Sequence, residues 1–410
     1  MTTPNDPFLT PEPAAREFSG QSSPADRDYI REKYNSNSSR RKWIILGSVV
    51  GVIAVIAIGV GVGVGVSHHS SSNRASGSGS KSPGTNTSVV PQTNPNDPST
   101  FVKDSRLHQS FYGLAYTPVG SIPPNCNSTL SDVIEDIQLM SQLTTRLRLY
   151  GSDCNQSALV LEAIKQTKVN MTVWLGDYNL PNDNGTEYNQ QKQAIVSVIN
   201  TYGVDHISGV DVGNEFMLNY LDANGATDPN SAVGNQGAQI LISNIQDMNK
   251  TLVAMNLPKH LPVGTSDAGA YFNTLVLEAI EFGMANDHPW FANVSIDQAA
   301  GWTWQFFEQT NVQPAAALSN HPTMYIAETG WPSASKDQGS LSNGPSIASV
   351  PNLQTFLDTF VCQANKNGTA YFYFEAFDET WKDITYGGVE GHWGLFNADK
   401  TLKNITIPSC

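Results

Sequence analysis

The sequence predicts an α/β protein whose main domain, residues 105–410, is a closed (β/α)8 TIM barrel. Three further parts are expected before it: a disordered tail, one transmembrane helix and a flexible linker. Short apolar stretches alternate with longer helical stretches throughout residues 105–410, which is the pattern of a parallel sheet. This segment also exceeds the typical ~250 residues that eight βα units require.

The first 66 residues predict a membrane anchor. Residues 1–42 are polar, rich in Pro, Ser, Asn and Asp, and lack apolar periodicity, so they are expected to be a disordered cytosolic tail. Residues 43–66 are uncharged and long enough to cross a bilayer, which takes about 20 apolar residues. Arg40, Arg41 and Lys42 precede this run, and the positive-inside rule therefore keeps the N-terminus in the cytosol. A buried core helix is the alternative, but the closely spaced glycines disfavour it.

The expected topology is a single-pass type II signal-anchor in the plasma membrane, with the C-terminal domain outside the cell. Residues 67–104 are dominated by Ser, Gly, Asn, Thr and Pro, the composition of a flexible spacer. The barrel is therefore expected to sit on a tether above the bilayer.

The charge distribution excludes some classes of partner. The chain carries a net charge of −14; residues 1–66 hold seven Lys/Arg and six Asp/Glu, which leaves a net −15 on the rest. An acidic domain is a poor match for nucleic acid or anionic lipid, so a neutral substrate is expected. The sequence has no Cys/His cluster and no Gly-rich phosphate loop, and we expect neither a metal nor a cofactor.

All four cysteines follow the apolar run, on the oxidising side of the membrane. Four cysteines allow three pairings. Cys362 with Cys410 is favoured because the last helices of a barrel and its C-terminus finish on the same face, which leaves Cys126 with Cys154. Nine glycosylation sequons also follow the run, at Asn86, Asn127, Asn155, Asn170, Asn184, Asn249, Asn293, Asn367 and Asn404.

Eight strand candidates account for the barrel. They begin at Phe111, Thr145, Thr172, Ile207, Leu261, Phe282, Met324 and Ala370, and a helix or a long loop follows each of them.

The period of two along a strand then assigns side chains to the barrel interior. In the fourth candidate, one side carries Gly209, Asp211, Gly213 and Glu215, while the other carries Val210 and Val212. In the second, Arg146, Arg148 and Tyr150 oppose Leu147 and Leu149. Acids and arginines are therefore expected to converge at the barrel mouth, where βα loops build active sites.

Two strand-end carboxylates suggest a chemistry. Glu215 ends the fourth strand and Glu328 the seventh, so their side chains are expected to meet across the mouth. Glycoside hydrolysis needs such a pair, one protonated to release the leaving oxygen and one ionised to attack the sugar. The alternative for either residue is an acid that merely stabilises the first turn of the next helix.

The motifs around these acids resemble a known family. "VDVGNEF" around Glu215 and "IAETGWPS" around Glu328 are similar to the two signatures of glycoside hydrolase family 17, the β-1,3-glucanases of fungi and plants. "RLYGSDC" and "FEAFDETWK" add to the resemblance, as does the anchored architecture of some fungal members. It implies a retaining barrel enzyme with Glu215 as proton donor and general base and Glu328 as nucleophile. The retaining route places the two carboxyl groups about 5–5.5 Å apart.

Further residues are candidates for substrate contact. Asn214 is expected to hold a sugar hydroxyl, or else to be a turn asparagine. Arg148 and His288 are expected to orient Glu328 or the substrate, unless they only satisfy one another. Aromatic rings that either stack on sugars or pack in the core are Tyr116, Tyr178, Trp331 and Trp381. Glu375, Asp378 and Lys382 resemble a sugar-contacting patch of the family.

The expected function is endo-hydrolysis of 1,3-β-glucosidic linkages in β-glucan of the fungal cell wall. One alternative is a β-1,3-glucan transglycosylase, in which a second sugar replaces water. An alternative of another class is a non-catalytic glucan-binding wall sensor or tether, which the presence of both Glu215 and Glu328 disfavours.

Overall fold

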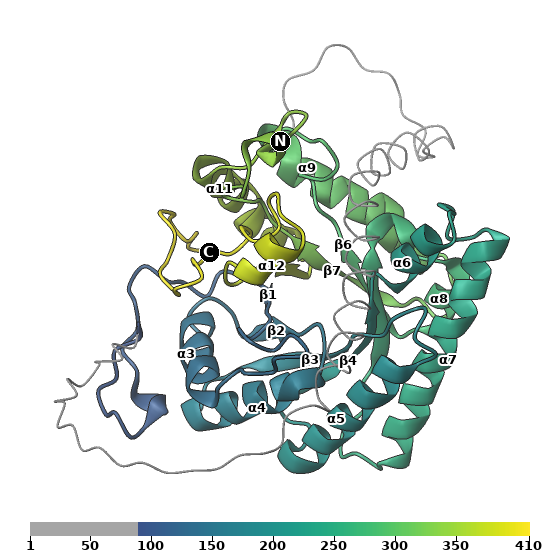
Figure 1. The fold of residues 1–410 in the computed structure, drawn as a ribbon, viewed down its shortest axis with the longest axis horizontal. Helices are drawn as coiled ribbons and strands as arrows, with labels where there is room; N and C mark the ends of the chain where they lie inside the picture. Colours follow the sequence, from purple (N-terminus) through teal and green to yellow (C-terminus); the bar gives the residue numbers. More distant parts are fainter. Residues whose placement is uncertain (1–88) are drawn as a thin grey trace, which may run out of the picture.

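A computed structural model describes residues 89–410, and in this range eight parallel strands close into a barrel in the order β1-β10-β7-β6-β5-β4-β3-β2. The predicted TIM barrel is confirmed (Figure 1), and each predicted strand overlaps an observed one. The strands are β1 (Gly113–Ala115), β2 (Arg146–Arg148), β3 (Thr172–Asp177), β4 (Ile207–Asn214), β5 (Val263–Ala268), β6 (Phe282–Asn286), β7 (Thr323–Thr329) and β10 (Tyr371–Tyr373).

Helices surround the strands (Figure 1). Several begin at a residue whose side chain accepts a hydrogen bond from the first turn, including Thr129, Ser231 and Ser349. The helices are α3 (Leu130–Met140), α4 (Gln156–Thr167), α5 (Thr186–Tyr202), α6 (Phe216–Ala223), α7 (Ala232–Ala254), α8 (Thr274–Ala279), α9 (Ile296–Phe307), α10 (Gln313–Ala316), α11 (Val350–Asn367) and α12 (Thr380–Thr385).

Shorter elements fill the connections. They are η1 (Pro98–Thr100), η2 (Asp153–Asn155), η3 (Gly269–Tyr271), the π-helical turn η4 (Glu308–Val312), η5 (Gln338–Ser340) and the hairpin β8 (Ser342–Asn343) with β9 (Ser346–Ile347). The hairpin and the π-helical turn were not anticipated from the sequence.

A layer of buried aromatic and apolar side chains fills the barrel interior. The Trp174 and Phe282 ring centroids lie 4.5 Å apart, and Tyr325 packs 5.5 Å from Trp174. Gly209 and Gly264 make room for this layer, because a Cβ on either would come within 2.8 Å of the rings of Trp174 or Phe282.

Register shifts interrupt the sheet where the polar residues emerge. One lies between Asp211 and Asn214 on β4, and another lies between Ala285 and Asn286 on β6. The alternation predicted for β4 is therefore wrong beyond Asp211: a Cβ on Gly213 would lie 3.3 Å from Leu241 of the outer helix α7. The bulge instead turns Asn214 towards the interior.

The domain begins earlier than the sequence predicted. Residues 89–104 were assigned to the linker, but Val90 is buried and the side chains of Gln92 and Gln138 are hydrogen bonded at 2.8 Å. The Gln138 amide also donates to Pro98 O at 2.7 Å, so this segment packs on α3. The predicted tail and span, residues 1–66, lie outside the described residues. Within residues 89–410 no helix is both long and apolar enough to cross a bilayer.

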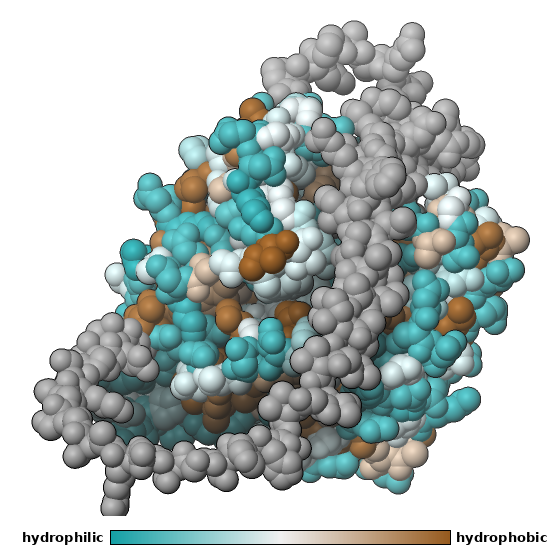
Figure 2. Space-filling view, in the orientation of Figure 1, coloured by the Kyte–Doolittle hydropathy of each residue, from teal (hydrophilic) through white to brown (hydrophobic). Residues whose placement is uncertain are grey.

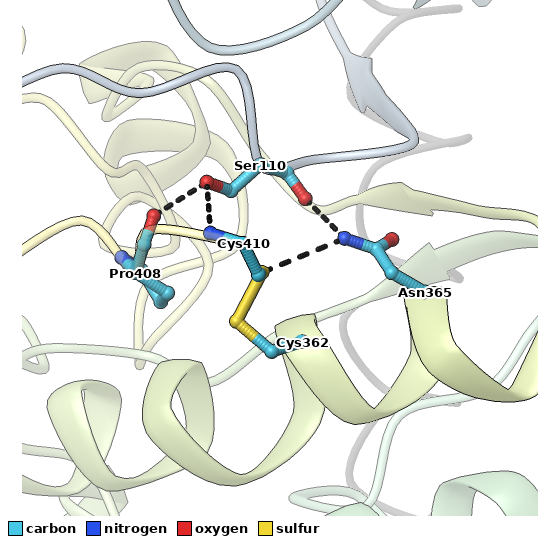
Figure 3. The surroundings of a disulfide bond; sticks show 5 residues. All are labelled: Ser110, Cys362, Asn365, Pro408 and Cys410. Carbon is cyan, nitrogen blue, oxygen red and sulfur yellow. Dashed lines mark hydrogen bonds between the residues drawn. A yellow bond between two sulfur atoms is a disulfide. The ribbon is translucent and has the colours of Figure 1, made fainter.

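Two disulfides form in the favoured pairing, Cys126 with Cys154 and Cys362 with Cys410. Figure 3 shows how the second is embedded: Ser110 accepts from Cys410 N and donates to Pro408 O, while Asn365 donates to Ser110 O. This bridge fixes the last residues of the described chain to α11.

The surface is compatible with the predicted glycans at most sequons. The Asn side chains at 127, 155, 170, 184, 249, 367 and 404 belong to exposed residues, whereas Asn293 is half-buried and its Oδ1 is enclosed. Asn86 lies outside the described residues. The face in Figure 2 is mostly hydrophilic where it is coloured, with scattered hydrophobic patches.

Candidate active site

Glu328 stands at the C-terminal end of β7 with its side chain almost fully buried. Its Oε1 accepts from Arg148 Nη1 at 3.1 Å, and its Oε2 lies 3.0 Å from His288 Nε2. Burial by itself would raise the pKa of Glu328, but the His288 hydrogen bond and the charges of Arg148, His288 and Lys382 outweigh it and lower the pKa to about 2. The carboxylate is therefore ionised at neutral pH.

Arg148 holds the site together from β2. Its buried guanidinium reaches Asp211 Oδ2 at 3.2 Å through Nε and Asn214 Oδ1 at 2.8 Å through Nη2, in addition to Glu328. The guanidinium carbon lies 4.5 Å from the ring centroid of Tyr150. One cation thus links β4 and β7 across the mouth.

Glu215 immediately follows β4 and caps α6 with a left-handed backbone, φ 53°. This conformation is uncommon for a residue with a Cβ and is concentrated at functional positions. The side chain is half-exposed, and its Oε1 accepts from Asn286 Nδ2 at 3.3 Å. Asn286 pairs in register with Glu328, so the same amide stands between the two carboxylate-bearing strands.

Asn214, the residue before Glu215, is hydrogen bonded through its side-chain oxygen. Its Oδ1 receives Arg148 Nη2 and, at 3.4 Å, Asn286 Nδ2. No hydrogen bond from its Nδ2 is made to any residue in the range 89–410, which leaves this donor facing the mouth for a ligand.

His288 sits in an aromatic box after β6. Its ring centroid lies 5.2 Å from that of Phe374, 5.1 Å from that of Trp393 and 5.7 Å from that of Phe291. Its Nδ1 has no hydrogen-bond partner among the described residues. The ring is therefore fixed by packing and presents only Nε2 to Glu328.

A second charged group lies beside the first. Lys382 on α12 contacts Glu375 Oε2 at 2.8 Å and Glu379 Oε2 at 2.7 Å. Burial, and then the Glu379 charge, raise the pKa of Glu375 well above its usual range, although Lys382 opposes them. Lys382 also contributes to the low pKa of Glu328. Glu375, Glu379 and Lys382 therefore belong to the wall of the same site.

The four aromatic residues predicted to stack on sugars differ in exposure. Trp381 and Tyr178 are partly exposed at the mouth, as substrate-stacking rings need to be. Tyr116 and Trp331 are fully buried, which favours the alternative that they pack in the core over stacking on sugars. The Tyr116 hydroxyl donates to Asp136 at 2.6 Å, and Trp331 Nε1 donates to Ile347 O at 2.9 Å. Both rings have packing roles with their polar atoms satisfied.

Asp378 also departs from its expected place. Its Oδ1 pairs with Lys403 Nζ at 2.7 Å and accepts from Gly394 N at 2.9 Å. Lys403 in turn donates to Ser333 Oγ at 2.6 Å. Asp378 is thus committed to joining the loops behind the site rather than to the patch of Glu375 and Lys382.

Sequence reasoning named no site role for Asp211, Asn286, Tyr150 or Glu379. The alternation on β4 had already turned Asp211 inward, and Tyr150 stood in the "RLYGSDC" motif, so both had a signal. Asn286 had none, because the bulge that aims it at Glu215 is not visible in the sequence. Within residues 89–410, no three His, Cys, Asp or Glu side chains gather as a metal site.

Comparison with known proteins agrees with this geometry. The family model for the BtgE/BtgC glycoside hydrolase domain matches residues 113–394. The chain belongs to this family. Among curated BtgC proteins, the probable glucan endo-1,3-beta-glucosidase of Aspergillus fumigatus is 35% identical over 323 residues, and the putative one of Aspergillus niger is 37% identical over 324. Each alignment covers 75% of this chain and 45% of the relative, so the chain spans about half the length of these curated proteins.

Solved structures place the BtgE/BtgC domain beside family 17 enzymes. The family 17 β-1,3-glucanosyltransferase from Rhizomucor miehei is 27% identical with a TM-score of 0.58, and the match covers 73% of this chain and 98% of that one. An endo-laminarinase from Formosa, at 19% identity and a TM-score of 0.56 over 71% of this chain and 84% of that one, shows the shared fold.

Replacing the Arg148 guanidinium should be costly to stability. Arg148→Met leaves Asp211 and Glu328 as buried carboxylates without their cation, and breaking a buried pair typically costs about 3–5 kcal/mol. Urea unfolding at pH 7 should show this loss, while Arg106→Met, which removes an exposed partner of Asp104, should change the midpoint little. Adding Glu328→Gln to Arg148→Met should recover part of the loss. An Arg148→Met midpoint equal to that of the Arg106 variant would contradict the network described.

Proposed function

We propose that the protein is a retaining glycosidase that cleaves 1,3-β-glucosidic linkages within β-glucan. The observation that carries this proposal is the pair of strand-end acids with opposed environments. Glu328 is buried and held ionised between Arg148 and His288. Glu215 is half-exposed, and among residues 89–410 its carboxylate accepts a hydrogen bond only from the neutral amide of Asn286. A nucleophile and a proton donor need these contrasting surroundings.

In the first half-reaction a protonated Glu215 gives its proton to the glycosidic oxygen as the bond from that oxygen to the anomeric carbon breaks. A Glu328 oxygen supplies the electron pair for a new bond to the anomeric carbon, which forms a glycosyl ester. Arg148 bonds to Oε1 of Glu328 and His288 bonds to Oε2, so the carboxylate is oriented before substrate binds.

In the second half-reaction the roles of Glu215 reverse. Forming the ester removes the negative charge of Glu328, and the now ionised Glu215 takes a proton from water while the water oxygen attacks the anomeric carbon. The ester bond breaks, its electron pair returns to Glu328, and the sugar leaves with its original configuration. Glu215 is then protonated and Glu328 ionised, so both acids are back in the states from which the next cycle starts.

Groups around the pair are suited to a neutral polysaccharide. The free Nδ2 of Asn214 supplies a donor beside Glu215, and Trp381 supplies a partly exposed ring next to Lys382, whose Nζ lies 5.9 Å from the ring centroid. Laminaritriose is bound by an active-site mutant of the Rhizomucor miehei enzyme, which matches this chain at 26% identity and a TM-score of 0.58. These features support a β-1,3-glucan as substrate.

Transfer to a second sugar is the alternative outcome of the same intermediate. The Rhizomucor miehei neighbour at 27% identity is a glucanosyltransferase, whereas the Aspergillus relatives are named as endo-glucosidases. Both reactions use Glu215 and Glu328 identically and differ only in what resolves the ester.

The chain is further proposed to act at the outer face of the plasma membrane as a type II protein. The uncharged run at residues 43–66, the basic residues before it and the sequons after it support this topology. The two disulfides of the described domain agree with an oxidising compartment.

Loss of either acid should abolish turnover of laminarin. Glu215→Gln removes the proton donor and should lower kcat by at least ~10²–10⁴, the usual contribution of general acid–base catalysis. Glu328→Gln removes the nucleophile and should leave no glycosyl ester to detect. Glu278→Gln, an exposed acid on α8, is the matched control.

Product length separates the three functions in the same experiment. Short oligosaccharides indicate hydrolysis, products longer than the substrate indicate transfer, and binding without products indicates a tether. Near-normal turnover by Glu328→Gln would overturn the proposed mechanism.

The acid limb of the pH profile should report the contacts of Glu328. Activity requires the carboxylate, so it is present above the pKa of about 2 and is lost as pH falls through that value. His288→Phe fills the aromatic box but removes the hydrogen bond and the histidine charge, which should raise the pKa and move the limb of kcat/KM upward by about one pH unit. His260→Phe, at an exposed pair with Glu281, should leave the limb in place. An unmoved limb in the His288 variant contradicts the assignment.

Membrane association should depend on residues 43–66. After carbonate extraction the full chain is expected in the membrane pellet with glycans that an endoglycosidase removes, and deletion of residues 43–66 should move it to the supernatant. Deletion of residues 1–38, which retains the basic residues and the apolar run, is the control and should stay in the pellet. Recovery of the full chain in the supernatant would refute the anchor.

A further inference from the structure

Asp287 lies between two residues of the site but faces away from it. Asn286 contacts Glu215 and His288 contacts Glu328, both on the mouth side of β6. The Asp287 carboxyl instead points to the outer layer, where a Cβ on Gly269 of η3 would lie 2.1 Å from Asp287 Oδ1 and 2.7 Å from Phe306 of α9. Its backbone N–H donates to Glu328 O at 2.8 Å, so Asp287 is also tied to the nucleophile strand.

The Asp287 carboxyl is completely enclosed, and neither oxygen has a hydrogen-bond partner among the described residues. A buried carboxylate left unpaired in this way is among the most costly arrangements in a protein. The cost disappears if the group carries a proton, because the neutral acid then offers an O–H donor to a nearby acceptor.

An unpartnered acceptor stands beside it. Asn311, in the π-helical turn η4, donates through Nδ2 to Gly269 O at 2.8 Å, which fixes its amide and leaves the enclosed Oδ1 without a donor. That Oδ1 lies 3.1 Å from the same Gly269 Cβ position that is 2.1 Å from Asp287 Oδ1. Both acceptor atoms therefore lie close to one point, and a proton on Asp287 would give Asn311 Oδ1 a donor.

We propose that Asp287 is a neutral carboxylic acid that donates to Asn311 Oδ1, anchoring the end of β6 to η4 and thereby positioning Asn286 and His288 against the two catalytic carboxylates. Asp287 is a positioning residue, since it touches neither substrate nor the reacting atoms. Its catalytic relevance rests on the proposed function, whereas its protonation does not. Single π-helical turns inside α-helices occur frequently at functional sites, which is consistent with η4 serving as the anchor.

The electrostatic surroundings agree. Burial alone raises the pKa of Asp287 well above its usual range, with no charged group opposing it. The titratable groups on the packed elements are otherwise engaged or remote: Glu328 on β7 bonds inside the barrel, Asp267 on β5 accepts from Met217 N and Leu218 N, and Glu308 on η4 is half-buried.

Thermal unfolding from pH 4 to pH 8 tests the protonation without any activity measurement. Unfolded Asp287 ionises near pH 4 while the folded group stays neutral, so the wild type takes up a proton on folding and loses stability as pH rises above 4. Asp287→Asn cannot titrate and preserves a donor for Asn311. Its Tm should equal that of the wild type near pH 4 and exceed it by roughly 2–3 °C more for each further pH unit.

Asp297→Asn, an exposed acid in the first turn of α9, is the matched control and should show no such divergence. A Tm of Asp287→Asn that lies below the wild type by the same amount at pH 4 and pH 8 would overturn the proposal, because it would mean that the native group is ionised.

Turnover of laminarin tests the positioning. Asp287→Ala and Asn311→Ala should each lower kcat about tenfold with KM little changed, since substrate contacts persist while Asn286 and His288 lose their support. The double variant should be no worse than either single one, because both remove the same bond. Asp287→Asn should restore kcat.

Equal losses in Asp287→Ala and Asp287→Asn, or additive losses in the double variant, would refute the anchor. If the wild type shows no turnover at all, the proposed function fails, and the Tm comparison still decides whether Asp287 is neutral.

Discussion

The buried guanidinium of Arg148 is the contact on which the barrel mouth depends. It starts on β2 and bonds Asp211 and Asn214 on β4 and Glu328 on β7, so three non-adjacent strands share one cation. Burying a charge is repaid only when its geometry and remaining hydrogen bonds are good. Arginine meets this condition because its planar guanidinium offers five N–H donors spread over three nitrogens. A lysine in the same place would offer three donors on a single nitrogen. The result is a carboxylate fixed in place before any substrate binds, which is what electrostatic preorganisation requires.

The aromatic layer below makes this contact strong. Trp174, Phe282 and Tyr325 close the barrel beneath the polar residues, so the guanidinium and Glu328 interact in a medium that water does not reach from below. Charges attract more strongly there than at the surface. The glycines that face these rings therefore matter for the chemistry as well as for packing. They let the strands carry large side chains inside a barrel narrow enough to bring Glu328, Arg148 and Asp211 into contact.

The sequence could predict what periodicity and turns determine. The eight strands follow from short apolar runs bounded by turns, and alternation along β2 turns Arg148 inward. Glu215 and Glu328 follow instead from their places at strand ends, since alternation fails on β4 beyond Asp211. What failed was anything set by contacts between distant segments. Tyr116 and Trp331 stand at strand ends as predicted, yet Asp136 of α3 and Ile347 of the β8–β9 hairpin cover them. Asp378 is expected from the sequence to lie in one patch with Glu375, but it forms an ion pair with Lys403 near the C-terminus. The bulge after Asp211 is likewise invisible in composition, because it arises from pairing with β5.

Glu328 and Asp287 lie on opposite faces of the barrel wall, and their pKa values shift in opposite directions. Glu328 and Asp287 are joined by a backbone hydrogen bond, and both are almost inaccessible to water. Burial raises the pKa of both, but Glu328 points inward to Arg148 and His288, whereas Asp287 points outward to Phe306 and the amide of Asn311. For these two acids, the side to which the carboxyl points therefore decides whether neighbouring charges offset the effect of burial on its pKa. Asn286 and His288 flank Asp287 at the end of β6, so the proposed anchor would hold both in place. On the inner face, Asn286 contacts the half-exposed Glu215 and His288 contacts the ionised Glu328.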